Sequence, residues 1–219
     1  SAIKIAVDMV KEKLISKKEA VLRIDPDTLD TLLHPTLDKK ANKKIIASGL
    51  PASPGAASGK VVFSADEAER LNGMMQDTIL VRVETSPEDI HGMHAAKGIL
   101  TSRGGMTSHA AVVARGMGRP CISGSSEIDI NYEEKNFKIS NLIVNEGDII
   151  TIDGSTGRII LGQVSTVKPK ISRDFSKLMS WADKYKKLKI RTNSETPLKM
   201  YEMNTHCVTL FISAAIGHH

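Results

Sequence analysis

The stretch GGMTSHAAVVARG at residues 104–116 constrains the fold most, because it places a glycine pair, two hydroxyl residues and a histidine directly before an alanine-rich run. Glycine permits a tight turn, and the hydroxyl of Thr107 or Ser108 can cap the helix that alanine favours. Gly116 is the expected stop of that helix. The stretch therefore predicts a loop followed by a short helix with His109 in its first turn.

A histidine in such a place is suited to carry phosphate. An ordinary imidazole has a pKa of about 6.5, so at neutral pH it is largely an uncharged nucleophile. The free N–H groups and the dipole of a helix N-terminus stabilise negative charge by about 0.3–1 kcal/mol. Arg103 and Arg115 are candidate phosphate partners, because guanidinium groups match phosphate oxygens. Residue chemistry also leaves open a core or capping role, since His109 shares a helix face with Val112 and Val113.

Strands and helices are predicted to alternate around this stretch. Ser64 opens a capping box and Ser86 caps a helix with proline at its first position; these helices are expected to end at Gly73 and Gly98. The apolar run at residues 78–83 predicts a buried strand. A loop rich in small residues is expected at 47–59, strands at 60–63, 98–101 and 120–123, and a hairpin at 149–153 and 158–161.

The flanks of this body are predicted to be helical. Apolar residues recur at helical spacing over residues 3–14, and the capping box SKKE at 16–19 predicts a second helix. Asp25-Pro26 predicts a third helix that stops near Pro35, and residues 172–188 predict an outgoing helix. The whole pattern indicates a mixed α/β body with a helical satellite.

Composition narrows the class of protein. The net charge is +5, but nine basic and two acidic residues lie within residues 168–191, so the rest of the chain is slightly acidic and nucleic-acid binding is not predicted. Cys121 and Cys207 lack metal-type spacing, and no apolar run is long enough to span a membrane. We expect a cytoplasmic protein without a metal site, in which His91 and His94 lie on a helix surface.

Several separated motifs resemble one family. The histidine stretch with its continuation GMGRPC at residues 116–121, ETSPEDI at 84–90, GLPASPGAASG at 49–59 and the segment 25–35 resemble the pyruvate, phosphate dikinase family. The resemblance runs from near the start of the chain to about residue 197. A looser form of the histidine motif also marks phosphoenolpyruvate (PEP) synthase and Enzyme I of the sugar phosphotransferase system, but the longer flanks favour the dikinases.

The resemblance implies an α/β fold, the swivelling β/β/α phosphohistidine domain with flanking linker helices. It implies a phosphotransferase that reversibly converts ATP, phosphate and pyruvate into AMP, diphosphate and PEP, with His109 as the transiently phosphorylated residue. In some family members the threonine two residues before the histidine is itself phosphorylated, which implicates Thr107 in regulation. The phosphate-stabilising loop and helix N-terminus would comprise Gly104, Gly105, Thr107, Ser108, Arg103 and Arg115.

The resemblance also implies how the chain is divided into domains and which ligands and partner domains the full enzyme uses. Residues 1–45 correspond to a helical linker from an ATP-grasp part, 46–165 to the swivelling domain, 166–197 to an outgoing linker helix and 198–219 to a non-matching tail. The full enzyme, a homodimer, uses ATP and Mg²⁺ and binds PEP or pyruvate on a barrel domain; none of these ligands is predicted to bind this chain itself. One histidine can reach two remote sites only by rotation, for which residues 44–50 and 164–172 are candidate hinges.

Two alternatives stay open. With 219 residues the chain is short for a complete dikinase, and complete turnover by it alone is not expected. No barrel motif follows Pro197, so Cys207 does not inherit the acid/base role of the barrel's cysteine. One alternative is a folded, non-catalytic module left by gene decay, without a phosphate donor. The other is the histidine domain of PEP synthase or Enzyme I.

Overall fold

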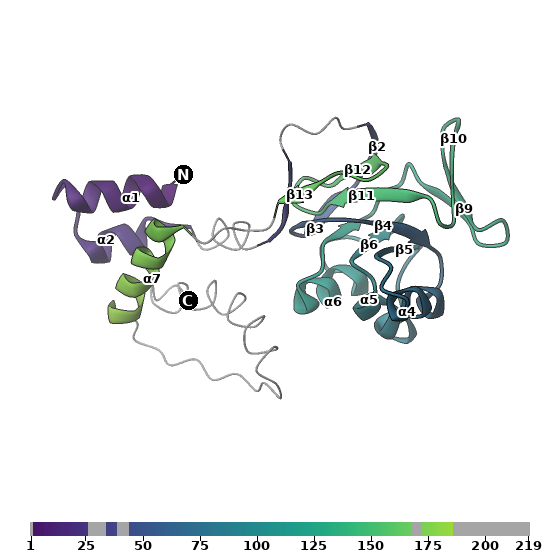
Figure 1. Ribbon diagram of the computed structural model, residues 1–219, viewed down its shortest axis with the longest axis horizontal. Helices are drawn as coiled ribbons and strands as arrows, with labels where there is room; N and C mark the ends of the chain where they lie inside the picture. The colour runs from purple at the N-terminus through teal and green to yellow at the C-terminus, as the bar shows by residue number, and fades with distance from the viewer. Residues whose placement is uncertain (1, 26–33, 39–43, 168–171, 186–219) are drawn as a thin grey trace. The chain divides into compact units, whose positions relative to one another are not determined.

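A computed structural model describes residues 2–25, 34–38, 44–167 and 172–185 (Figure 1). These residues fall into two compact units, one drawn from residues 1–33 and 169–219 and the other from residues 34–168. The third helix expected after residue 25, the non-matching tail and Cys207 lie outside the described residues.

Among the described residues of the first unit are the helices α1 (Ala2–Lys11), α2 (Lys17–Leu22) and α7 (Arg173–Tyr185). Ser16 caps α2 as predicted, because its Oγ accepts a hydrogen bond from Glu19 N at 3.1 Å. Helices from the two ends of the chain share one apolar core, to which α7 contributes Phe175, Leu178 and Ala182. The outgoing helix therefore packs with the two helices that begin the chain.

The second unit is built on an eight-stranded mixed sheet with the order β2-β12-β11-β4-β5-β6-β7-β3. Strands β4, β5, β6 and β7 run parallel, and the other neighbours pair antiparallel. The strands of this sheet are β2 (Ile45–Ser48), β3 (Leu50–Ser53), β4 (Ala56–Val62), β5 (Thr78–Arg82), β6 (Gly98–Thr101), β7 (Cys121–Ser123), β11 (Ile149–Asp153) and β12 (Arg158–Leu161). Two smaller sheets contain β8 (Asp129–Asn131), β9 (Asn136–Ile139) and β10 (Leu142–Asn145), and β1 (Thr36–Leu37) with β13 (Thr166–Val167).

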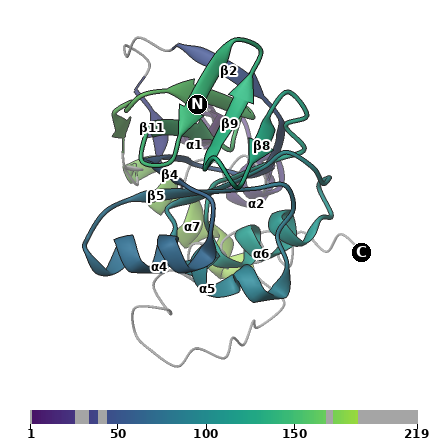
Figure 2. The same ribbon diagram turned by 90° about the vertical axis from the view of Figure 1, so that its right-hand side faces the viewer.

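The second unit is built in three layers (Figures 1 and 2). Helices α4 (Ala65–Gly73), α5 (Ile90–Ala95) and α6 (His109–Met117) cover one face of the parallel strands. The large sheet curves so that its antiparallel strand β11 lies over β6 and β7 on the other face, where the sheet β8–β10 also lies. Successive side chains of β5 point to opposite faces of the sheet. Ile79 and Val81 therefore share one core with Phe137, and Leu80 packs with Met93 on the helical side. The predicted β/β/α fold is confirmed.

Local sequence signals predict several elements correctly. Strands β5 and β6 and the hairpin β11–β12 form where expected, and Ser64 caps α4 by accepting a hydrogen bond from Glu67 N at 3.2 Å. Ser86 begins a 3₁₀ turn (Pro87–Asp89) that continues as α5, which ends at Ala95 instead of Gly98. The expected stop of α6 at Gly116 is wrong, because α6 ends at Met117 and Gly118 supplies the left-handed C-cap with φ 64°.

The predicted loop at residues 47–59 is also wrong. Strands β2, β3 and the start of β4 occupy it, and the small residues serve close backbone approaches instead. A Cβ at Gly49 would lie 2.7 Å from Ile122 Cγ2, and one at Gly59 would lie 2.8 Å from Asp77 O. The hinge expected at 44–50 is contradicted for residues 45–48, which pair with β12. No sequence pattern predicts the sheet β8–β10.

Alanine at Gly92 is expected to lower the free energy of unfolding by about 1–3 kcal/mol, the usual cost of overpacking. Helices α4 and α5 touch at this glycine, where an added Cβ would lie 2.3 Å from Ala65 Cα. Backbone cannot move aside as a flexible side chain would. Gly116→Ala in α6 is the control, since nothing lies within 4 Å and alanine there should stabilise by about 0.5–1 kcal/mol. Urea unfolding of both variants measures the difference, and equal stabilities would contradict the close approach.

Cys121 is expected to resist alkylation in the folded chain. Burial raises the pKa of this thiol to about 12, against a smaller opposing effect of the Arg115 charge. Only thiolate alkylates, and at pH 8 such a thiol is thiolate to about one part in 10⁴. Iodoacetamide labelling read by peptide mapping should modify Cys121 slowly until guanidinium unfolds the chain.

The burial of the Cys121 thiol also makes the free energy of unfolding fall as the pH rises above about 9, because only the unfolded chain then releases the thiol proton.

Candidate functional site

The predicted histidine loop lies where the parallel strands end. The chain leaves β5, β6 and β7 at this edge of the sheet, and the loops that follow are joined through their backbones. Arg103 N donates a hydrogen bond to Val83 O at 3.0 Å, and Ser125 N donates one to Thr101 O at 3.0 Å. The carboxyl ends of parallel strands are where open α/β sheets bind ligands. The loop therefore occupies a place typical of functional sites.

A row of three hydroxyls fixes the N-terminus of α6. Ser108 is the N-cap, and its Oγ accepts a hydrogen bond from Ala111 N at 3.4 Å. The same oxygen lies 3.1 Å from Ser123 Oγ, which in turn lies 3.1 Å from Thr101 Oγ1. Of the two hydroxyl residues that the sequence offered as caps, Ser108 is used and Thr107 is exposed.

The two glycines of the loop play different parts. Gly104 has φ 104°, and a Cβ there would lie 2.8 Å from Ser108 Cβ. A Cβ at Gly124, in the loop after β7, would lie 2.5 Å from Gly104 O, so the two loops meet backbone to backbone. Around Gly105 nothing lies within 4 Å of an added Cβ. The tight turn therefore depends on the first glycine of the pair.

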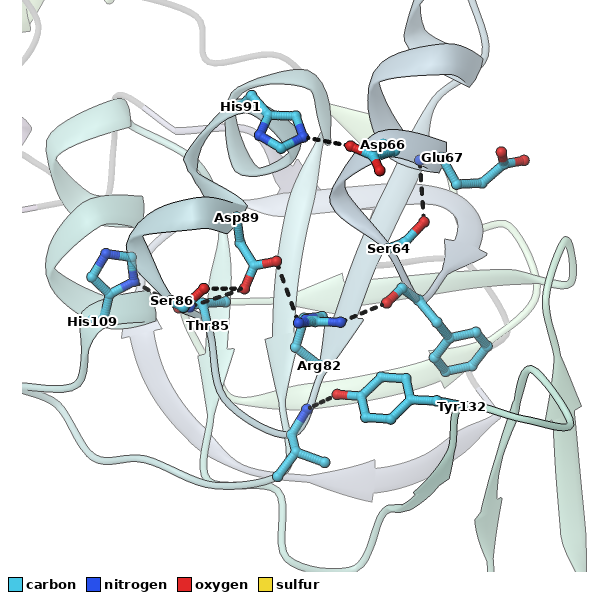
Figure 3. A network of polar contacts seen from close by, with 12 residues as sticks. Ser64, Asp66, Glu67, Arg82, Thr85, Ser86, Asp89, His91, His109 and Tyr132 are labelled. Carbon is cyan, nitrogen blue, oxygen red and sulfur yellow. Dashed lines mark hydrogen bonds and ion pairs between the residues drawn. The ribbon is translucent and has the colours of Figure 1, made fainter.

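His109 is the first residue of α6, as the sequence predicts, and it is half-buried. Its Nδ1 lies 2.9 Å from Thr85 Oγ1, which belongs to the loop after β5 (Figure 3). Within the described part of the chain, no protein group bonds the other ring nitrogen, Nε2. The first turn of α6 contains no acidic residue, so no carboxylate there offsets the positive end of the helix dipole. The ring is held by one nitrogen and can react through the other.

The two candidate arginines differ in their surroundings. The Arg103 side chain is exposed beside the histidine loop. The guanidinium of Arg115 is held by backbone carbonyls instead, with Nε donating to Ala52 O at 2.8 Å and Nη2 donating to Met106 O. Arg115 therefore ties the loop to β3.

Residues 2–25, 34–38, 44–167 and 172–185 contain no group of three or more His, Cys, Asp and Glu side chains that could hold a metal ion. His91 Nε2 lies 3.0 Å from Asp66 Oδ1, and both residues are exposed. In the part of the chain that the structure describes, no helix is long and apolar enough to cross a bilayer.

Sequence reasoning missed Thr85. It stands 24 residues before His109, in the motif ETSPEDI, which predicts a helix cap at Ser86 and contributes to the family resemblance but does not single out Thr85. A usable signal was present, since the motif follows the predicted strand 78–83 and the histidine loop follows the predicted strand 98–101. Neighbouring parallel strands bring such loops to one edge of the sheet.

The chain is similar in sequence to members of one family. Residues 74–157 match the family model of the PEP-utilising enzyme mobile domain. Pyruvate, phosphate dikinase of Rhizobium meliloti is 59% identical over 197 residues, which are 90% of this chain and 22% of that protein. The Clostridium symbiosum enzyme is 56% identical over 199 residues, 90% of this chain and 23% of its own. Pyruvate, phosphate dikinase 1, chloroplastic, of Arabidopsis thaliana is 52% identical over 198 residues, 90% of this chain and 21% of its own.

The chain thus spans about a fifth of the length of the curated relatives it matches. Among solved structures, aconitase X of Thermococcus kodakaraensis aligns over 53% of this chain and 98% of its own, with a TM-score of 0.33 and 16% identity, a likeness too low to carry an argument. The sequence matches confirm the resemblance inferred from the motifs. Residues 74–157 match the mobile domain of PEP-utilising enzymes, and 90% of the chain is similar to a segment of pyruvate, phosphate dikinase.

Proposed function

We propose that this chain is the phosphoryl-carrying segment of a pyruvate, phosphate dikinase and that His109 is its transiently phosphorylated residue. The geometry of His109 carries the proposal: the ring stands at the N-terminus of α6, with Nδ1 on Thr85 and Nε2 open. Similarity to pyruvate, phosphate dikinases over 90% of the chain supports the class of reaction.

In the proposed step, the lone pair of His109 Nε2 attacks the phosphorus of a donor. The N–P bond forms as the P–O bond to the leaving oxygen breaks, and that oxygen takes the bonding electron pair. In this proposal the proton is on Nδ1, which lies 2.9 Å from Thr85 Oγ1, and it stays on the ring throughout the step. Attack of an acceptor oxygen on the same phosphorus breaks the N–P bond and returns the neutral imidazole.

The surrounding loop is proposed to stabilise the phosphoryl group. N–H groups in the first turn of α6 and the exposed Arg103 would meet its oxygens, and the helix dipole would contribute about 0.3–1 kcal/mol. Gly104, Gly105 and Ser108 shape the loop, and Arg115 holds it in place. The exposed hydroxyl of Thr107 is open to a regulatory kinase, which supports the proposed modification there.

The complete reaction needs parts beyond this chain. The whole enzyme would convert ATP, phosphate and pyruvate into AMP, diphosphate and PEP, with ATP and Mg²⁺ held by an ATP-grasp domain and a barrel domain. His109 would visit both sites as the unit of residues 34–168 rotates relative to the other domains. We place this enzyme in the cytoplasm, as a homodimer.

The proposal is tested by supplying the missing donors. The chain is mixed with a barrel domain of a relative, Mg²⁺ and PEP labelled in its phosphate, or with an ATP-grasp domain, labelled ATP and phosphate. Label that is lost in acid, retained in alkali and mapped to His109 is the expected result. Absence of label with both donors would overturn the carrier role and favour the decayed module.

The same mixture separates the related families. Discharge of the label onto pyruvate and onto AMP with diphosphate is the result expected for a dikinase. Discharge onto AMP and phosphate would indicate a PEP synthase. Transfer onto a small phosphocarrier protein, with no labelling by ATP, would indicate an Enzyme I domain.

A further inference from the structure

A buried carboxylate lies next to the loop that holds His109. The side chain of Asp89, at the end of the 3₁₀ turn Pro87–Asp89, is only 8% exposed. Its Oδ2 accepts hydrogen bonds from Ser86 N at 2.9 Å and from Ser86 Oγ at 3.3 Å. Its Oδ1 lies 3.4 Å from Arg82 Nη2 (Figure 3). A buried charge is tolerated when it is paired and bonded in this way.

Arg82, at the end of β5, is itself held from three directions. Besides the ion pair with Asp89, its Nη1 donates to Phe63 O at 3.0 Å. The guanidinium also lies over the ring of Tyr132, 5.2 Å from its centroid. The Tyr132 hydroxyl in turn accepts a hydrogen bond from Val83 N at 2.8 Å. Figure 3 shows Arg82 between the Asp89 carboxylate and Tyr132.

These contacts fix both ends of the short segment that contains Thr85. Val83 N is bonded to Tyr132 on one side, and Ser86 N is bonded to Asp89 on the other. Thr85 is the residue directly before Ser86, and its Oγ1 meets His109 Nδ1 at 2.9 Å. The direction of the Thr85 side chain therefore depends on contacts made by its neighbours in the chain.

We propose that Asp89, anchored by Arg82, is a positioning residue that acts through Thr85 to keep the proton of His109 on Nδ1 and the lone pair on Nε2. Neutral imidazole in water prefers the opposite tautomer, with the proton on Nε2, which leaves no lone pair where phosphate is to be received. A hydroxyl held against Nδ1 as an acceptor reverses that preference. This inference deepens the proposed function and rests on it.

The test reads the tautomer directly. The full chain is labelled with ¹⁵N-histidine and studied at pH 8, where an ordinary imidazole is neutral. The His109 signals, assigned by their loss in His109→Gln, should show a protonated Nδ1 and an unprotonated Nε2. Thr85→Val and Asp89→Asn should both move the population toward protonated Nε2. Both should also slow labelling by the PEP donor roughly 10- to 100-fold, as displacement of a reacting group does.

Two further variants serve as controls. Thr85→Ser keeps the hydroxyl and should retain the wild-type tautomer. Asp66→Asn removes another carboxylate that pairs with α5, through His91 at 3.0 Å, but this side chain is 94% exposed and should change neither reading. A wild-type tautomer in Asp89→Asn, alongside a changed one in Thr85→Val, would overturn the role of Asp89.

A further variant tests the role of Asp89 if Asp89→Asn does not fold. If Asp89→Asn unfolds, Arg82→Lys is used, which keeps the positive charge but loses the fork that reaches both Asp89 and Phe63 O. An unchanged tautomer in that variant would equally overturn the inference. If the wild-type chain takes no label from any donor, the proposed function fails, whereas the tautomer reading still decides whether Asp89 positions the ring.

Discussion

Replacing His109 by alanine is expected to abolish phosphorylation of the chain, with acid-labile label reduced roughly 10³-fold or more, because no other group can replace a missing nucleophile. The fold should survive the change. His109 is half-buried at the first position of α6, and alanine is the strongest helix former. The measurement is the labelling by PEP and a barrel domain, together with circular dichroism and urea unfolding of the variant.

His109→Gln sharpens this prediction, since glutamine keeps a polar group near Thr85 but offers no nucleophile. His91→Ala and His94→Ala are matched controls, because both side chains are exposed on the neighbouring helix α5. Their labelling should equal that of the wild type. Label that persists in His109→Ala would place the phosphate on another residue. Label that disappears in His91→Ala would show that the assay reports stability and not chemistry.

Those elements of the fold that have a local cause are predicted from the sequence. The caps at Ser16 and Ser64 need only a hydroxyl and a backbone N–H three residues on, so the sequence is enough to place them, whereas it leaves Thr107 and Ser108 as alternative caps of α6. The segment 47–59 fails for the opposite reason. Its small residues look like loop composition, yet they form strands because β12 and β7 lie beside them. Distant pairing of this kind leaves no local periodicity to detect.

The candidate site likewise combines residues that the sequence predicts with contacts that it does not predict. His109 and its helix are contiguous in sequence, so the pattern alone predicts their place. The partner of the ring, Thr85, comes from another loop: the sequence predicts that both loops follow strands, but it does not predict which side chains meet between them. The predicted strand end and cap around residues 82–89 are correct, but they do not reveal that Arg82 and Asp89 pair with each other. Such contacts require the parallel order of β5 and β6, which only the structure supplies.

Alanine at Gly104 is expected to impair phosphorylation roughly 10-fold or more. At φ 104° an alanine costs about 1–3 kcal/mol in backbone strain, and each 1.36 kcal/mol that reaches the transition state is tenfold in rate. The added Cβ would also lie 2.8 Å from Ser108 Cβ and 3.0 Å from Ser108 Oγ. Relief of either conflict shifts the residue that caps α6, and with it the position of His109. Rates of labelling by the PEP donor measure the effect.

Gly105→Ala is the matched control, one residue further along. Nothing lies within 4 Å of its added Cβ, and its φ is not in the left-handed region, so the free chain should fold with wild-type stability. The ratio of the labelling rates of Gly104→Ala and Gly105→Ala shows whether the effect comes from the left-handed backbone conformation at Gly104 or from the loss of any glycine in the loop. Equal rates in both variants would mean that the turn at Gly104 is not what holds the helix N-terminus in place. A slow Gly105→Ala with unchanged stability would instead place the bound phosphoryl group against that glycine, since only an occupant of the open space could then meet the new methyl group.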